Sequence, residues 1–132
     1  MKRDFELIRE ILLAIEEQHT GVAINGFKVE GYDLTTVAYH CKLLEEVGFI
    51  SAYKASYADN AIYNIAVGGL TWEGNDYLDK VRDNTVWKKT KDTIKKKGLP
   101  LLIDTIKSIA TAFITAAAEG VANSIIKNGG QV

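Results

Sequence analysis

Residue types that commonly do chemistry are scarce in this chain, which has two histidines, one cysteine and four serines among 132 residues. His40 and Cys41 are adjacent, but successive helical residues point about 100° apart, so a helix would not pair them as base and nucleophile. Cys41 falls on an apolar helix face and is predicted to be a small buried hydrophobe. No spacing matches a zinc site, and no glycine motif is of the phosphate-binding type. We therefore predict a protein that is not an enzyme and holds no cofactor or metal.

Lysines are the strongest electrostatic feature. The stretch "WKKTKDTIKKK" carries six of them against one aspartate. On a helix, Lys88, Lys91 and Lys95 share one face, where they are candidates for contacts with nucleic-acid phosphates. The alternative is a solvated face, or lysines that complement the negative end of their own helix. An anionic membrane surface is less favoured, because Trp87 and Ile94 give only a narrow apolar stripe.

The net charge of −1 does not by itself indicate a nucleic-acid binder. Residues 1–70 carry six basic and ten acidic side chains, a balance of −4, whereas residues 71–98 carry eight basic and five acidic, a balance of +3. The positive charge is therefore concentrated in the lysine-rich stretch.

The segment 33–47 is predicted to be a helix that ends at Gly48, a residue suited to the left-handed conformation that terminates helices. Two strands follow, "FISAYKASY" and "AIYNIAV", joined by the turn "ADN". A further helix begins near Thr71 as its N-cap, with Trp72, Leu78 and Val81 as its apolar contacts. This order of helix, β-hairpin and helix is typical of a winged helix. One face of the helix 33–47 is predicted to be buried: Leu34, Val37, Ala38, Cys41, Leu44 and Val47.

If the protein reads DNA, the helix 33–47 would lie in the major groove and the hairpin would be the wing. The outward candidates for contact are Thr35, Thr36, Tyr39, His40 and Lys42, with Lys54 on the hairpin. This set lacks Arg, Asn and Gln, which make the commonest bidentate contacts with bases. Glu45 and Glu46 would repel phosphates. The preceding residues 20–32 are too rich in glycine and too short for a full positioning helix, and they predict one or two short strands with a turn at Asn25-Gly26.

Two further helices complete the predicted fold. The first runs from the N-cap Asp4 to about Gln18 and buries Phe5, Ile8, Leu12 and Ile15. The last runs over 99–127, where Pro100 would occupy its first turn. Its apolar face is long for a small domain to cover, so we predict a homo-oligomer formed through this helix. The residues proposed for that contact are Leu102, Ile106, Ile109, Phe113, Ala117 and Gly120.

Composition and length limit the possible settings. The chain is 47% hydrophobic, enough for one domain with a core. A single cysteine fits a reducing cytoplasm. The N-terminus lacks the apolar core of a signal peptide, and the uncharged run 108–118 is far shorter than the ~20 apolar residues that a membrane span needs, so no span is predicted. The tail "NGGQV" is expected to be frayed.

Three motifs carry a resemblance to a known family: "MKRDFELIREILLAIEE", "VAYHCKLLEEVGFI" and "LTWEGNDYLDKVRDNTVWKKTK". In this order, over about residues 1–97, they resemble a family of small bacterial and phage proteins known only as a domain of unknown function. The resemblance implies a winged helix of the kind found in prophages and other mobile elements. It implies no activity and no catalytic residues.

The sequence thus predicts an α+β fold with a winged-helix domain at 1–82 and a helical extension at 83–132, made of a basic helix 84–97 and the apolar helix. The predicted function is a DNA-binding, transcription-regulator-like protein of a mobile element. The alternative is a protein-interaction module that keeps the winged-helix shape without reading DNA.

Overall fold

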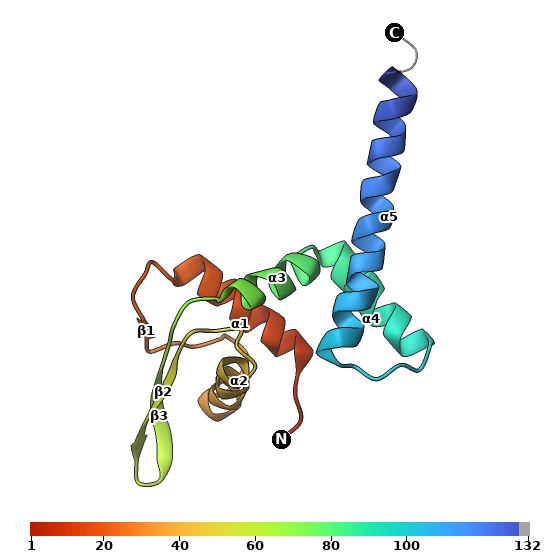
Figure 1. The fold of residues 1–132 in the computed structure, drawn as a ribbon. Helices are drawn as coiled ribbons and strands as arrows, with labels where there is room; N and C mark the ends of the chain where they lie inside the picture. The colour runs from red at the N-terminus through yellow and green to blue at the C-terminus, as the bar shows by residue number, and fades with distance from the viewer. Residues whose placement is uncertain (130–132) are drawn as a thin grey trace. The chain divides into compact units, whose positions relative to one another are not determined.

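The structure is a computed structural model that describes residues 1–129 (Figure 1). Within them the predicted α+β class is confirmed, and the chain divides into two compact units, Met1–Leu78 and the residues from Asp79 onward. The prediction for Gly130–Val132 lies outside the described residues. The elements are α1 (Phe5–Gln18), β1 (Ile24–Asn25), α2 (Leu34–Glu46), β2 (Tyr53–Ala58), β3 (Ala61–Val67), α3 (Trp72–Val81), α4 (Asn84–Lys96) and α5 (Ile103–Gly129).

Helix α1 begins as predicted at Asp4, whose carboxylate accepts hydrogen bonds from the backbone N–H groups of Glu6 and Leu7 at 3.0 and 3.1 Å. The helix packs against α2 and supplies much of the core of the first unit. Its buried side chains are the four predicted, Phe5, Ile8, Leu12 and Ile15, together with Leu7 and Ile11.

Helix α2 has Asp33 as its N-cap, which accepts from the Thr36 N–H at 2.7 Å. Four of the six residues predicted for its apolar face are buried: Val37, Ala38, Cys41 and Leu44. Leu34 is half-buried, and Val47 is 48% exposed, so burial of Val47 was a wrong prediction. Val47 is the C-cap residue, and the chain turns at Gly48 with φ +82°, so that Phe49 and Ile50 enter the core instead.

The sheet is antiparallel and has the strand order β1-β3-β2. The hairpin predicted for 49–67 is present, although β2 starts only at Tyr53. Its two-residue loop is Asp59-Asn60, both at positive φ, as a type I′ turn requires. The pairing register shifts between Ser56 and Tyr57. The result is a twisted hairpin that extends beside α2 (Figure 1).

Helix α3 begins after Thr71, whose hydroxyl accepts from the Gly74 N–H at 3.0 Å and donates to the Gly48 carbonyl oxygen. The predicted cap is therefore confirmed. Trp72 was predicted to make apolar contacts and is instead 85% exposed. At about 100° per residue it lies about 180° around the helix from the buried Val81.

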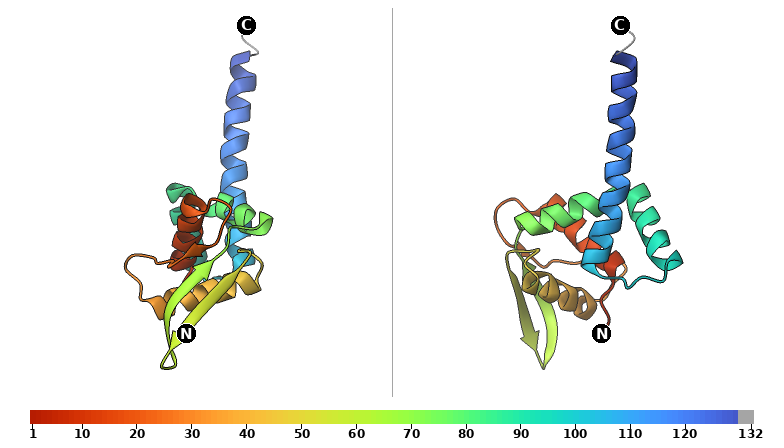
Figure 2. Two further views of the ribbon diagram at one scale, coloured as in Figure 1. Left: turned by 90° about the vertical axis from the view of Figure 1, so that its left-hand side faces the viewer. Right: turned by 45° about the vertical axis from the view of Figure 1, so that its right-hand side comes forward.

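Helices α4 and α5 pack against each other in the second unit, and α4 lies along only the first part of α5 (Figure 2). Asp83 caps α4, and Gly98 at φ +64° follows its end. Helix α5 begins at Ile103, not near Pro100 as predicted, so Leu99 and Leu102 lie outside it. It continues to Gly129, into the stretch expected to be frayed. The buried side chains of this pair are Trp87, Thr90, Ile94, Ile106 and Ala110.

Candidate functional site

The outward face of α2 is smaller than the sequence indicated. Thr35 and Lys42 are exposed, and Thr36 and Tyr39 are half-buried. His40 is only 1% exposed, so it was wrongly placed among the outward residues. Its ring lies against the N-terminal segment, where Nε2 accepts from the Asp4 N–H at 2.8 Å, while Nδ1 lies 2.8 Å from the Thr36 carbonyl oxygen. His40 is therefore a structural residue of α2.

Two more polar side chains of α2 form hydrogen bonds with residues outside the helix. The Tyr39 hydroxyl donates to the Met1 carbonyl oxygen at 2.9 Å. The Glu45 carboxylate, expected to repel phosphates, accepts from the Tyr53 N–H at 2.8 Å at the start of β2. This bond fixes the beginning of the hairpin to the last turn of α2. The face that remains is bordered by the hairpin and by the N-terminal segment (Figures 1 and 2).

The hairpin presents Lys54, which is exposed as the sequence predicted, and two aromatic side chains that sequence reasoning did not select. Tyr57 and Tyr63 are each 64% exposed. The shift in register between β2 and β3 occurs beside them. Alternation along a strand predicts one buried face, but the bulge interrupts this alternation near the tip, which is why pattern reading missed both tyrosines.

The segment 27–33, between β1 and α2, forms no helix, in agreement with the glycine-rich sequence. It borders a hollow of about 580 Å³ whose lining residues are Lys28, Val29, Glu30, Gly31, Tyr32, Leu34 and Val37. The pKa of Tyr32 is raised, mainly because the hydroxyl is partly removed from water. The nearby carboxylates of Asp4, Glu10 and Glu6 raise it further by smaller amounts. This loop stands where a positioning helix would be expected in a winged helix.

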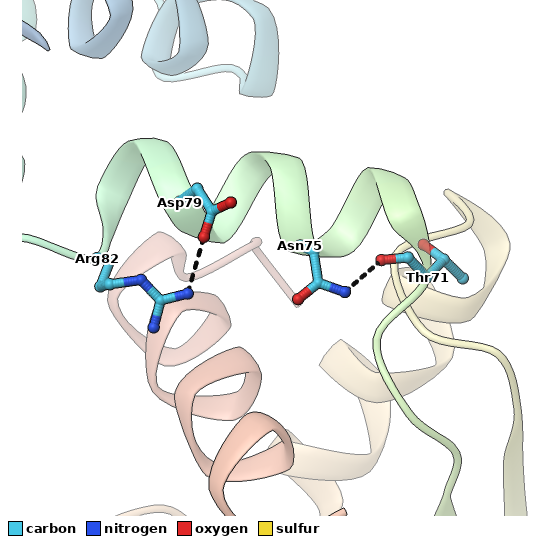
Figure 3. Close-up of polar contacts among 4 residues, drawn as sticks. All are labelled: Thr71, Asn75, Asp79 and Arg82. Carbon is cyan, nitrogen blue, oxygen red and sulfur yellow. Dashed lines mark hydrogen bonds and ion pairs between the residues drawn. The ribbon is translucent and has the colours of Figure 1, made fainter. Parts of the chain in front are cut away.

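The start of α3 ties the end of α2 to the hairpin. Figure 3 shows Asn75 Nδ2 donating to the Thr71 carbonyl oxygen at 2.9 Å. Gly74 packs so closely that a Cβ at this position would lie 2.0 Å from the Phe49 carbonyl oxygen. At Gly68 and Gly69 an added Cβ would likewise meet a neighbouring segment, Ser51 and His19 respectively.

In the second unit, most of the predicted lysine cluster is available to a ligand. Lys88 and Lys95 are exposed, whereas Lys91 is half-buried with its Nζ 5.2 Å from the centre of the Trp87 ring. Just before α4, Arg82 pairs with Asp79 at 2.8 Å (Figure 3). Among the described residues no group of three His, Cys, Asp or Glu side chains could hold a metal ion.

The residues proposed for oligomerisation are only partly accessible. Ile106 is fully buried within the single chain and was wrongly included among the surface residues of this contact. Ile109 and Phe113 are half-buried, and Ala117 and Gly120 are exposed. The structure adds exposed apolar residues beyond the packed part of the helix: Ile114, Val121, Ile125 and Ile126.

By its length and composition alone, the segment Ile103–Lys127 could cross a membrane: its most apolar stretch has a mean hydropathy of 1.5, and 6% of that stretch is buried. Glu119 lies within the segment.

Comparison with known proteins places the chain among hypothetical proteins. It is 42% identical over 118 residues to a protein of Haemophilus influenzae titled "Uncharacterized protein", and the alignment covers 87% of this chain and 97% of that relative. No solved structure matches. The model of the family described as "Hypothetical protein (DUF2513)" matches residues 2–100, the same part of the chain that carries the three sequence motifs. The chain therefore belongs to the DUF2513 family of hypothetical proteins.

Proposed function

We propose that this protein is a winged-helix DNA-binding module, transcription-regulator-like and non-enzymatic, that acts in the cytoplasm for a mobile genetic element. The supporting observation is the order α1-β1-α2-β2-β3 with the sheet order β1-β3-β2, in which the exposed face of α2 lies beside a projecting hairpin. A helix next to a β-hairpin is the arrangement by which winged helices enter the major groove and touch the flanking backbone.

In this proposal α2 supplies few contacts with bases and the lysines supply most of the affinity. Thr35 and Lys42 face the groove, Lys54 meets the backbone from the hairpin, and Lys88 and Lys95 bind phosphates from the second unit. Phosphate contacts of this kind are independent of sequence and weaken as salt is added. Two protomers joined through α5 would present two such sites, as many helix-turn-helix dimers do.

A titration of fluorescently labelled, mixed-sequence duplex DNA at several salt concentrations tests this function. Binding that weakens steeply with salt is expected, and Lys88→Ala with Lys95→Ala should lower the slope of log K against log salt by roughly 1.8, at about 0.9 for each phosphate contact. Lys91 is left in place because it packs on Trp87. Lys28→Ala with Lys127→Ala removes the same charge from exposed positions that the proposal does not use. Absence of binding even at low salt rejects DNA as the partner.

A second candidate function, docking of another protein, is favoured by one observation. The first unit exposes three large aromatic side chains, Tyr57, Tyr63 and Trp72, and such residues are enriched at the centres of protein interfaces. If the titration shows no binding to DNA, Trp72→Ala becomes the first variant to compare in a search for a protein partner.

A further inference from the structure

The first four residues are held along α2 by bonds that span the sequence. The Met1 carbonyl oxygen accepts from the Tyr39 hydroxyl at 2.9 Å, and the Asp4 N–H donates to His40 Nε2 at 2.8 Å. The partners are 38 and 36 residues apart. The segment Met1–Asp4, called the arm below, therefore has a fixed course beside α2, with the end of the chain close to that helix (Figures 1 and 2).

The bond of the arm to His40 depends on which ring nitrogen carries the proton. Nδ1 faces the Thr36 carbonyl oxygen, which only accepts, so the proton lies on Nδ1. Nε2 is then the acceptor that the Asp4 N–H requires. The carboxylate of Asp4 caps α1 at the same time. The arm is thus anchored to α1 at its end and to α2 at two points.

The arm brings positive charge to a face of α2 that has little of its own. Lys2 and Arg3 are both exposed, and the Arg3 guanidinium lies 5.8 Å from the centre of the Phe5 ring, which orients it. Lys42 on α2 and Lys54 on the hairpin are exposed as well. These four basic side chains belong to α2 and to the two segments that border it.

We propose that the arm binds phosphates of duplex DNA on the side of α2 opposite the hairpin. This inference rests on the proposed function of α2. The arm would contact the phosphates of one DNA strand and the hairpin those of the other. These contacts on both sides would fix the position of α2 along the groove, although α2 itself has few groups that can read bases. Lys2 and Arg3 are the binding residues, and Tyr39 is a positioning residue that acts through the Met1 carbonyl.

The test is a DNA titration of Lys2→Ala with Arg3→Ala against the control pair Lys28→Ala with Lys127→Ala, which removes an equal charge. We expect the arm variant to bind roughly tenfold more weakly at low salt and its salt slope to fall by about 1.8, with a smaller change in the control. Thermal unfolding of both pairs should match that of the unmodified protein. If the two pairs of variants bind DNA with the same affinity and the same salt slope, the proposal that the arm binds phosphates is rejected.

Failure of the arm is distinguishable from failure of the proposed function. If the unmodified protein does not bind DNA, the proposed function fails. If it binds and Lys42→Ala weakens binding while the arm variant does not, only the arm is rejected.

Tyr39→Phe tests positioning, because it removes the bond to Met1 and leaves both charges. It should weaken binding in the unmodified protein and have no further effect in the Lys2/Arg3 variant. An equal effect in both backgrounds would mean that Tyr39 touches DNA itself, which overturns its positioning role.

Discussion

His40 and Cys41 are neighbours on α2, and both are buried, but for different physical reasons. His40 is held by two hydrogen bonds that satisfy both ring nitrogens. Cys41 lies among apolar side chains, where burial raises the pKa of its thiol to about 12. A thiol with so high a pKa remains protonated at neutral pH and is a poor nucleophile. The sequence predicted burial for Cys41 from its place on the apolar face, but nothing in it indicated the partner of His40.

The raised pKa of Cys41 makes stability depend on pH in the alkaline range. The unfolded thiol loses its proton above about pH 8.5 while the folded thiol keeps it, so the unfolded state is favoured as pH rises. We expect the free energy of unfolding to be constant with respect to this group below pH 8 and to fall by roughly 1–2 kcal/mol between pH 8 and 10. Urea unfolding at these pH values measures the change.

Cys41→Ala is the control for that measurement, since it removes the titrating thiol at the cost of a small cavity. The free energy of unfolding of this variant should be lower at pH 8 than that of the unmodified protein, but it should fall less between pH 8 and pH 10. Burial also raises the pKa of the Tyr77 hydroxyl, and that group contributes only once the unfolded tyrosine titrates near pH 10. If the free energy of unfolding falls equally steeply with pH in both proteins, Cys41 is not the group that causes the fall.

At the scale of elements, the junction of α2, the hairpin and α3 depends on close backbone approach. Helix α3 crosses the Phe49 carbonyl at Gly74, where no side chain fits. One face of the same helix stacks Tyr77 against Phe49, with ring centres 5.1 Å apart. Because Glu45 and Thr71 also bond to backbone groups here, the position of the hairpin relative to α2 is fixed by several contacts.

Gly74→Ala is expected to destabilise the protein although alanine is the better helix former. Alanine gains about 1 kcal/mol in helix propensity, but its Cβ would lie 2.0 Å from a backbone oxygen and force α3 to shift. Overpacking of this kind costs roughly 1–3 kcal/mol and should outweigh the gain. The change is measured by thermal or urea unfolding.

Gly120→Ala is the matched control for packing within one chain, because a Cβ at this exposed helical position meets nothing within 4 Å. The same substitution should there be neutral or slightly stabilising. Since Gly120 is also among the residues proposed for the oligomer contact, both glycine variants are compared in the Val121→Glu/Ile125→Glu background, in which that contact is expected to be lost. If both variants unfold like their parent protein, the close approach of α3 to Phe49 has little energetic importance.

At the scale of the whole molecule, the unpacked part of α5 is the main unsatisfied apolar surface. Val121, Ile125 and Ile126 are 61%, 66% and 70% exposed on a helix of 27 residues. Helices in water are stabilised mainly by packing an apolar face, so an uncovered helix of this kind favours association. Association of two chains through α5 would place two DNA-binding units in one particle, as the proposed function expects.

Val121→Glu with Ile125→Glu should convert the oligomer into a monomer, because two charges would have to be buried in the contact. Light scattering after size-exclusion chromatography gives the mass of each species. Thr111→Glu with Thr115→Glu adds the same charge to the polar side of the helix and should leave the oligomer intact.

A monomeric unmodified protein would contradict this prediction. Flotation of the protein with lipid vesicles, lost in the Val121/Ile125 variant and kept in the Thr111/Thr115 variant, would instead assign α5 to a bilayer.

The sequence by itself determined what depends on local chemistry. Caps at Asp4 and Thr71, the helix stop at Gly48 and the turn before Ala61 could all be predicted, because each depends on a few adjacent residues. Periodicity likewise identified most of the buried residues of α1 and α2.

Only the tertiary structure decided what depends on partners distant in the chain. The ring of His40 bonds to Asp4, the outward position of Trp72 follows from how α3 crosses Phe49, and Ile106 is buried on a helix that packs against α4. The basic arm belongs to the same class, since its course is set by bonds to residues 36 and 38 positions away. Such contacts leave no periodic signal in a single sequence, because neither partner constrains the residues next to it.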